Sequence, residues 1–176
     1  FLNTDVNAVA SSSIFHFTQY TPLDIKNELN KFNFPVRAWF MRTIAIIPAR
    51  GGSKRIPKKN IKLFYDKPII SYSIKVALDS KLFDEVMVST DDLEIANIAK
   101  EFGAKVPFIR SKKASDDFAT TFDVVKEVIE KYEDNNQKFD TVCCIYPCAP
   151  FITVNTLKVS FKIFNENKFE SVFPVI

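Results

Sequence analysis

The chain has 176 residues, of which 47 % are hydrophobic and 26 % are charged, and its net charge is only +3. This composition is typical of one folded domain and excludes a disordered chain. No apolar run approaches the ~20 residues of a membrane span, and the first 20 residues carry no Lys or Arg, which argues against a secretory signal. The three cysteines form no CxxC pair, so we expect a reducing, cytoplasmic location.

Residues 1–40 differ from the rest of the chain. They mix aromatic and polar residues with little periodicity and contain the only histidine, His16. A short helix capped by Thr21 is predicted there, with three apolar residues on one side: Leu23, Leu29 and Phe32. Because a clean apolar strand follows Met41, we expect the functional domain to cover 41–176 and residues 1–40 to be an extension of unknown role. The chain starts at Phe1 and stops inside an apolar run, so we expect a C-terminally truncated fragment.

Strands and helices alternate from Met41 onward. The apolar runs predict strands at 42–48, 85–90, 105–109, 140–147 and 170–176. Apolar stripes of helical period predict helices at 68–80, 92–102, 121–134 and 153–165. Short links between alternating elements favour a three-layer α/β fold, in which helices cover both faces of a mostly parallel sheet.

Several residues mark the ends of the predicted helices. Pro68 begins one, Thr153 caps another, and Gly103 follows a third at the position usual for a C-terminal cap. Asp91 is expected to cap the helix at 92–102, with Glu94 as its capping-box partner. The alternative is that Asp91 lies near a ligand or its metal.

A strongly basic stretch, "IPARGGSKRIPKKNIK" at 47–62, follows the first predicted strand. It carries six basic residues from Arg50 to Lys62 and no acid, so the rest of the chain sums to −3. A nucleic-acid or membrane binder would spread its charge over a whole face, whereas a local cluster suits a small and highly charged ligand.

This stretch has the features of a phosphate-binding loop. Gly51 and Gly52 leave backbone N–H groups unobstructed and allow positive φ. Arg50 can bind two phosphate oxygens at once, and Lys54 and Lys59 can act as point charges. The loop matches neither the G-x-x-x-x-G-K-[ST] nor the G-x-G-x-x-G pattern, so we expect another kind of nucleoside-triphosphate loop. The alternative is a solvated basic turn.

Three further polar loops follow strands and should meet at the same edge of the sheet. They are "STDD" at 89–92, "RSKKASDD" at 110–117 and "YPCAPF" at 146–151. Arg110 and Ser115 could reach a ligand there, and the rigid proline turn could hold a base or sugar edge or be only a tight connection. Residues 41–176 contain no histidine, which excludes Ser-His-Asp and Cys-His mechanisms and a His-ligated metal. The chemistry must then rest on positioning, phosphate neutralisation and Mg²⁺.

Together these loops resemble those of the CMP-sialic acid synthetase family of cytidylyltransferases. "PARGGSKRIPKKN" at 48–60 is similar to the family pattern PARxGSKRxPxKN, and "STDDLEIA" and "RSKKASD" resemble two further family motifs. The fourth-strand loop of the family often reads QPTSPLR, whereas here it is "YPCAPFI", with Tyr146 in place of Gln and Cys148 in place of Thr. This variant looks most like the branch that handles pseudaminic acid.

The resemblance implies a Rossmann-like nucleotidyltransferase, with 41–176 as its N-terminal part. The implied reaction transfers CMP from CTP to an acidic nine-carbon sugar, releases pyrophosphate, and serves surface glycan or flagellin glycosylation. Arg50 and Lys59 are the implied catalytic residues, and Tyr146 would face the sugar. The implied nucleotide-binding residues are Ala49, Arg50, Gly51, Gly52, Ser53, Lys59, Asn60, Arg110 and Ser115.

Other implications of the resemblance concern parts beyond Ile176. The Mg²⁺ ligands and the segments that form a homodimer are expected there, so this fragment alone should be inactive and should hold no metal. N-acetylneuraminate and legionaminate remain alternative sugars. A non-catalytic module that binds RNA or another anion is the alternative of a different class, but only Phe64 and Tyr65 supply aromatic residues beside the basic cluster.

Overall fold

The computed structural model describes residue 29, residues 42–167 and residues 169–174. The chain divides into two units, Phe1–Phe40 and Met41–Ile176, and nearly all of the described residues belong to the second. Three features of the sequence analysis lie outside the described residues. They are the helix capped by Thr21, the histidine at position 16, and the start of the domain at Met41. The role assigned to 1–40 therefore stays a prediction.

A three-stranded parallel sheet forms the centre of the second unit. Its strands are β1 (Thr43–Pro48), β4 (Glu85–Ser89) and β5 (Thr141–Cys144), in the order β4-β1-β5. Ala45 of the central strand pairs with Val86 on one side and with Cys143 on the other. The predicted parallel α/β architecture is confirmed, and the strands at 42–48, 85–90 and 140–147 lie where they were expected.

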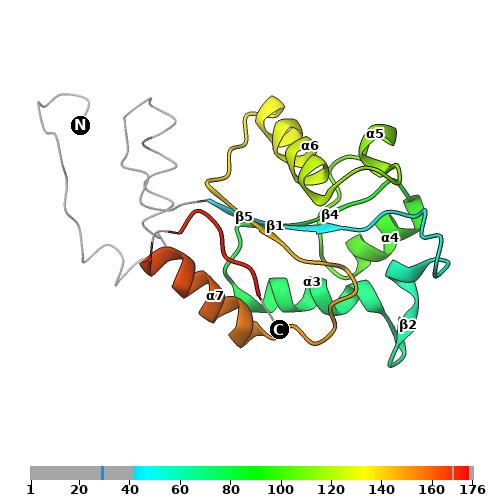
Figure 1. The fold of residues 1–176 in the computed structure, drawn as a ribbon, viewed down its shortest axis with the longest axis horizontal. Coiled ribbons are helices and arrows are strands. Elements are labelled where there is room, and N and C mark those ends of the chain that lie inside the picture. The colour runs from blue at the N-terminus through cyan, green and yellow to red at the C-terminus, as the bar shows by residue number, and fades with distance from the viewer. Residues whose placement is uncertain (1–28, 30–41, 168, 175–176) are drawn as a thin grey trace, which may run out of the picture. The chain divides into compact units, whose positions relative to one another are not determined.

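Helices cover both faces of this sheet (Figure 1). They are α3 (Ile69–Ser80), α4 (Leu93–Glu101), the short α5 (Lys112–Ser115), α6 (Thr121–Asp134) and α7 (Val154–Glu166). The four long helices agree with the predicted ones to within one residue at each end. Gly103 adopts φ 90° after α4, as expected for a C-terminal cap, and Thr153 accepts the N–H of Thr156 at the start of α7.

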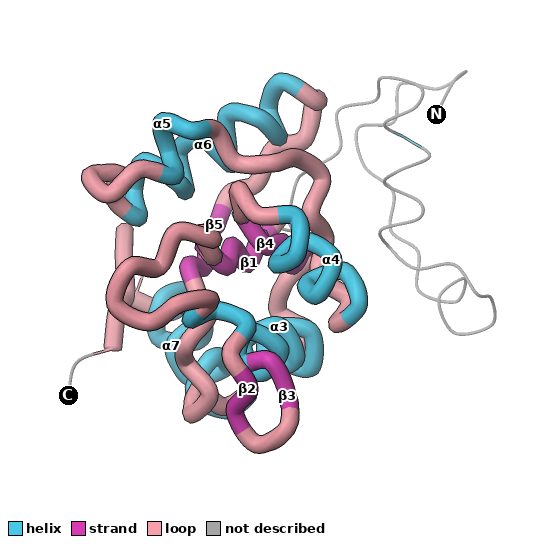
Figure 2. The backbone as a smooth tube through the Cα atoms, turned by 90° about the vertical axis from the view of Figure 1, so that its right-hand side faces the viewer, coloured by secondary structure: helices cyan, strands magenta, loops and turns pink. Residues whose placement is uncertain are grey.

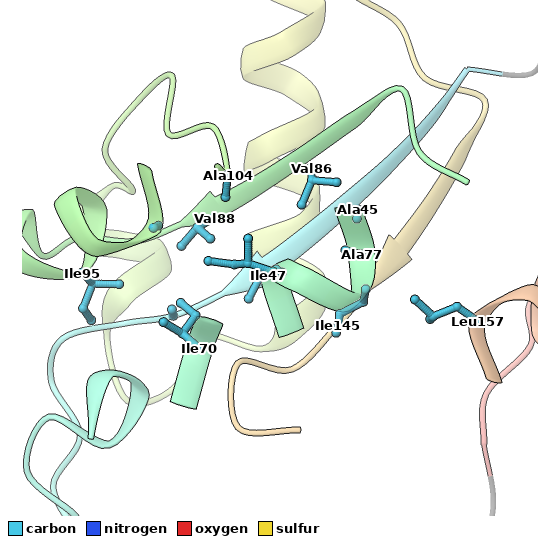
Figure 3. Close-up of a cluster of buried hydrophobic side chains, with 13 residues drawn as sticks. Ala45, Ile47, Ile70, Ala77, Val86, Val88, Ile95, Ala104, Ile145 and Leu157 are labelled. Atoms are coloured by element: carbon cyan, nitrogen blue, oxygen red, sulfur yellow. The ribbon is translucent and has the colours of Figure 1, made fainter. Parts of the chain in front are cut away.

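Successive residues of β1 belong to two different hydrophobic cores. Ala45 and Ile47 pack with Ile70 and Ile74 of α3 and with residues of α4 and α7 (Figure 3). The intervening residues Ile44 and Ile46 pack with Val128 and Tyr132 of α6, on the opposite face. The edge-on view in Figure 2 shows α5 and α6 on one side of the strands and α3 and α7 on the other. Because both faces of β1 are buried, the carboxyl end of the strand is held firmly in place.

Two predicted strands are wrong. At 105–109 only an isolated bridge from Lys105 to Met87 forms, and Pro107 has no N–H with which to continue it. Residues 171–174 of the strand expected at 170–176 are not in a strand, Pro174 again lacks a donor, and 175–176 lie outside the described residues.

A small hairpin between β1 and α3 was not predicted. Its strands are β2 (Leu63–Phe64) and β3 (Lys67–Pro68), and a short 3₁₀ helix η1 (Lys59–Ile61) precedes them. Tyr65 and Asp66 both adopt positive φ in the two-residue turn, which is the conformation that Asn-Gly pairs usually supply. The turn therefore gave no sequence signal of the usual kind. Among the helices that the structure describes, none is both long and apolar enough to cross a membrane.

Candidate active site

A cavity of about 700 Å³ lies at the carboxyl end of the sheet. Its walls come from the basic loop after β1, from the segment between Arg110 and α6, and from the start of the loop after β5. The residues that line it are Pro48, Arg50, Ser53, Lys54, Arg55, Ile56, Lys59, Asn60, Arg110, Ala114, Asp116, Asp117, Ala119, Thr120, Thr121, Val124, Tyr146 and Pro147. Three of the four predicted loops therefore meet at one cavity.

The fourth predicted loop, at 89–92, lies behind the basic loop and supports it. Asp91 accepts the N–H of Gly51 at 2.9 Å, so this N–H is not free for a phosphate. The cap of α4 is Asp92 rather than Asp91, and it accepts the N–H groups of Glu94 and Ile95. The expected capping role of Asp91 is thus wrong by one residue, because the backbone turns into the helix only after Asp92.

Gly51 and Gly52 do not have the positive φ that the sequence allowed for them. A Cβ on Gly51 would lie 2.7 Å from Oδ2 of Asp92, whereas a Cβ on Gly52 would meet nothing within 4 Å. Gly51 therefore allows the basic loop to approach the start of α4 closely, and Gly52 is not required by space or by backbone conformation.

Arg50 makes two polar contacts with the segment before α6. Its Nη1 donates to the main-chain oxygen of Asp116 at 2.8 Å and lies 3.1 Å from Oδ1 of Asp117. Lys54 pairs with the other oxygen of the same carboxylate. The hydrogen bond from Lys54 holds the pKa of Asp117 below its usual range, and Arg50 acts in the same direction. Two cations of the loop therefore converge on a single anion.

Asn60 is buried beneath the basic loop and links it to the loop after β5. Its Nδ2 donates to the main-chain oxygen of Arg50 at 2.9 Å, and its Oδ1 accepts from the thiol of Cys148 at 3.4 Å. Lys59, in the same 3₁₀ turn, lines the cavity. Burial raises the pKa of the Cys148 thiol, so it stays a neutral donor near pH 7. The visible role of Asn60 is to position Arg50.

Arg110 contributes a buried cation to the cavity wall. Its side chain is only 6 % exposed, its Nε donates to Oγ of Ser89 at 3.0 Å, and its Nη2 donates to the main-chain oxygen of Ser89. Burial lowers the pKa of the guanidinium, and the nearby carboxylate of Asp91 opposes that effect. Because an arginine side chain remains protonated in proteins, Arg110 supplies a fixed positive charge at the end of β4.

Tyr146 stands at the start of the loop after β5 with 61 % of its surface exposed. Its hydroxyl lies 3.2 Å from Oγ1 of Thr121, at the start of α6. The buried hydroxyl of Ser73 donates to the main-chain oxygen of Tyr146 at 2.8 Å and fixes the backbone there. The main chain of Tyr146 is thus held by Ser73 and its hydroxyl by Thr121, while most of the ring stays exposed to a ligand.

Four predicted site residues do not line the cavity: Ala49, Gly51, Gly52 and Ser115. Ala49 is fully buried in the core, and its N–H donates to the oxygen of Ser89 at 2.8 Å. The hydroxyl of Ser115 donates to the main-chain oxygen of Ser111, the residue that caps α5. The other predicted site residues all line the cavity: Arg50, Ser53, Lys59, Asn60, Arg110 and Tyr146.

The candidate site residues predicted from the sequence do not include the acidic and hydroxyl residues just before and at the start of α6. Asp117 and Thr121 both line the cavity and contact predicted site residues. Thr120 forms a capping box with Asp123, which "TTFD" signals in the sequence because Thr is followed three residues later by an acid. Nothing in the sequence indicated that Asp117 would meet Arg50, 67 positions earlier.

The described part of the chain holds no group of three or more His, Cys, Asp or Glu side chains placed to bind a metal ion. The expectation that the Mg²⁺ ligands lie beyond Ile176 stays a prediction.

The parallel α/β fold agrees with the comparisons with known proteins. Residues 44–175 match the cytidylyltransferase family model, so this chain belongs to the cytidylyltransferase family. It is 50 % identical over 133 residues to the pseudaminic acid cytidylyltransferase of Campylobacter jejuni strain NCTC 11168, a match that covers 76 % of this chain and 57 % of that protein. The family expected from the motifs is confirmed, and relatives from its pseudaminic acid branch are 48–50 % identical to this chain.

Other relatives act on different sugars according to their names. The CMP-N,N'-diacetyllegionaminic acid synthase of Legionella pneumophila is 38 % identical over 70 % of this chain and 53 % of its own length. Among solved structures, this chain is similar to the CMP:2-keto-3-deoxy-manno-octonic acid synthetase complexed with CTP, with a TM-score of 0.62. The match has 24 % identity and covers 72 % of this chain and 48 % of that chain, so it supports the fold alone. The chain spans little more than half the length of the curated pseudaminic acid relatives it matches in Campylobacter.

Proposed function

We propose that the protein containing this chain transfers CMP from CTP to pseudaminic acid and releases pyrophosphate. The observation that carries the proposal is the convergence of Arg50, Lys54, Lys59 and Arg110 on one cavity at the carboxyl edge of a parallel sheet. In open α/β sheets ligands bind at this edge. The family membership and the 50 % identity to a pseudaminic acid cytidylyltransferase support the choice of nucleotide and sugar.

The charges of the cavity suit this chemistry. The anomeric hydroxyl of the sugar would attack the α-phosphorus of CTP, and pyrophosphate would leave from the opposite side. Negative charge builds on the leaving pyrophosphate, and fixed cations such as Arg50 and Lys59 stabilise it in the transition state. Arg110 would contact the nucleotide, and the exposed phenol of Tyr146 would face the sugar.

The sugar is tested by measuring pyrophosphate release from CTP by the full-length protein. Pseudaminic, legionaminic and N-acetylneuraminic acids are compared at equal concentrations, with ATP, GTP and UTP as nucleotide controls. Fastest turnover with CTP and pseudaminic acid is expected. Equal or faster turnover of N-acetylneuraminic acid would reject the assignment of the sugar, and absence of CTP-dependent release with all three sugars would reject the reaction itself.

The role of Arg50 is tested in the same assay. Arg50→Ala should lower kcat/KM for CTP by roughly 10²–10³-fold, as expected for one charged transition-state contact. A loss below about threefold would place Arg50 outside the site. The homodimer and the Mg²⁺ ligands are further parts of this proposal that follow from the family resemblance, and the cytoplasmic location follows from the cysteine pattern.

Legionaminic and N-acetylneuraminic acids are the second candidate sugars. A relative named for legionaminic acid is 38 % identical to this chain, and two named for N-acylneuraminate are 37 % and 39 % identical, compared with 50 % for a pseudaminic acid relative. A non-catalytic RNA-binding module has no specific observation in its favour, because the basic loop forms part of a cavity with acidic residues in its wall.

A further inference from the structure

The two cations of the basic loop that carry ion pairs within the cavity share one partner. Oδ1 of Asp117 lies 3.1 Å from Nη1 of Arg50, and Oδ2 pairs with Nζ of Lys54. All three residues line the same cavity. A carboxylate therefore occupies the position where cations of the loop would meet an incoming anion.

The segment that carries Asp117 has an ordered local structure. The side chain of Asp116 accepts the N–H groups of Phe118 at 2.9 Å and of Ala119 at 2.6 Å, which forms a tight turn around Asp117. The main-chain oxygen of Asp116 accepts from Arg50 at 2.8 Å. The turn thus presents the carboxylate of Asp117 to the basic loop from the opposite wall of the cavity.

Carboxylate and phosphate oxygens bind a guanidinium in the same way, so they compete for it. We propose that Asp117 is an internal anion that occupies part of the phosphate position of the basic loop, and that the β- and γ-phosphates of CTP displace it when they bind. This inference rests on the proposed function. It makes Asp117 a determinant of nucleotide affinity: a ligand must carry enough negative charge to replace the carboxylate on both cations.

The same contact also favours release of the product. When pyrophosphate leaves, the carboxylate of Asp117 can return to Arg50 and Lys54, so the two cations are not left without a counter-charge. The exposure of the pair is consistent with exchange, because the Asp117 side chain is 40 % exposed and the Lys54 side chain is 79 % exposed. Exposed ion pairs contribute little to stability and are readily replaced.

The test is a set of calorimetric titrations of the full-length protein with CTP, pyrophosphate and cytidine. Asp117→Asn should bind CTP and pyrophosphate roughly three- to tenfold more tightly, the effect of removing two exposed ion pairs, and cytidine with unchanged affinity. Asp134→Asn makes the same charge change at the far end of α6 and should leave all three affinities within about twofold of wild type. Asp117→Glu restores the charge and should return the CTP affinity toward the wild-type value.

Each outcome bears on a separate claim. Unchanged or weaker CTP binding by Asp117→Asn, with normal binding by wild type, would overturn this inference and leave the proposed function in place. Equal tightening by Asp134→Asn would also overturn it, because general charge would then explain the effect. Wild-type protein that binds neither CTP nor pyrophosphate would overturn both. A thermal melt of each variant confirms that it is folded.

Discussion

Asn60 holds the main chain at Arg50: its Nδ2 donates to the Arg50 oxygen at 2.9 Å while the Asn60 side chain is buried. The position of the Arg50 guanidinium therefore depends on a residue that lies 10 positions later in the chain. Asn60→Asp replaces the NH₂ donor with an oxygen that faces the same carbonyl. We expect this change to lower the free energy of unfolding by about 1–3 kcal/mol, the usual effect of an unsatisfied buried polar group.

This prediction is checked by urea denaturation. Asn97→Asp is the matched control, because Asn97 is exposed on α4. If the two variants lose equal stability, the hydrogen bond from Asn60 does not hold the loop. In the full-length protein, Asn60→Asp should also raise KM for CTP, since a displaced Arg50 would meet the phosphates less well.

The two adjacent glycines of the basic loop should respond differently to alanine. Gly51→Ala places a Cβ 2.7 Å from Oδ2 and 2.8 Å from Cβ of Asp92, the residue that caps α4. We expect a loss of about 1–3 kcal/mol in the free energy of unfolding, because the main chain must shift. Gly52→Ala meets nothing within 4 Å and should change stability by less than about 0.5 kcal/mol. Thermal or urea unfolding of the pair measures the difference, and equal losses would contradict the close approach of Gly51.

Arg110 should be needed for stability as well as for ligand binding. Arg110→Met keeps most of the side-chain volume but removes the donors to Oγ and the main-chain oxygen of Ser89. We expect a loss of roughly 2–3 kcal/mol in the free energy of unfolding. Arg110→Lys should recover only part of it, since an ammonium cannot reproduce both contacts. A Met variant as stable as wild type would show that these hydrogen bonds are not important in solution.

Glu127 should make stability depend on acid pH. Burial alone would raise the pKa of Glu127, but hydrogen bonds from Lys131 and Ser111 outweigh burial and lower the pKa below its usual value. A carboxyl whose pKa is depressed by folding stabilises the protein above its unfolded pKa, and this contribution is lost as pH falls through the folded pKa. We expect the urea concentration at the unfolding midpoint to decrease in wild type as the pH is lowered below about 4.5. The decrease should be less steep in Glu127→Gln. Parallel pH profiles of the two proteins would contradict this role.

The regular elements of the fold could be predicted because each has a local cause. Apolar stripes and caps such as Thr153 and Gly103 define the helices, and continuous apolar runs define strands that are buried on both faces. The strand expected at 105–109 was wrong because Pro107 interrupts its hydrogen bonding, and the hairpin at 63–68 was missed because the turn at Tyr65 and Asp66 lacks the usual glycine. Both Asp91 and Asp92 are suitable cap residues by type. Asp92 is the cap because the helix begins at Leu93, a boundary that the sequence pattern does not define to one residue.

The candidate site was predictable in its cations and not in its anions. Arg50 and Lys59 follow β1, and Arg110 follows the isolated bridge at Lys105, so all three lie at the edge of the sheet where ligands bind. The pairing of Arg50 with Asp117 depends on how the turn before α6 folds, and the role of Gly51 depends on its distance from Asp92. These are tertiary contacts between residues far apart in the chain, which local patterns do not encode.

The pairing of the sheet continues one residue past β1, because the N–H of Ala49 donates to the oxygen of Ser89. The loop therefore leaves the sheet at Arg50, directly after a strand whose two faces are buried in separate cores. Amide protons at Ile46 and Ile47 should exchange with solvent only when the whole domain opens, and the protection should extend to Ala49. Arg50 directly follows this protected backbone, so we expect its rearrangements on ligand binding to be confined to the side chain.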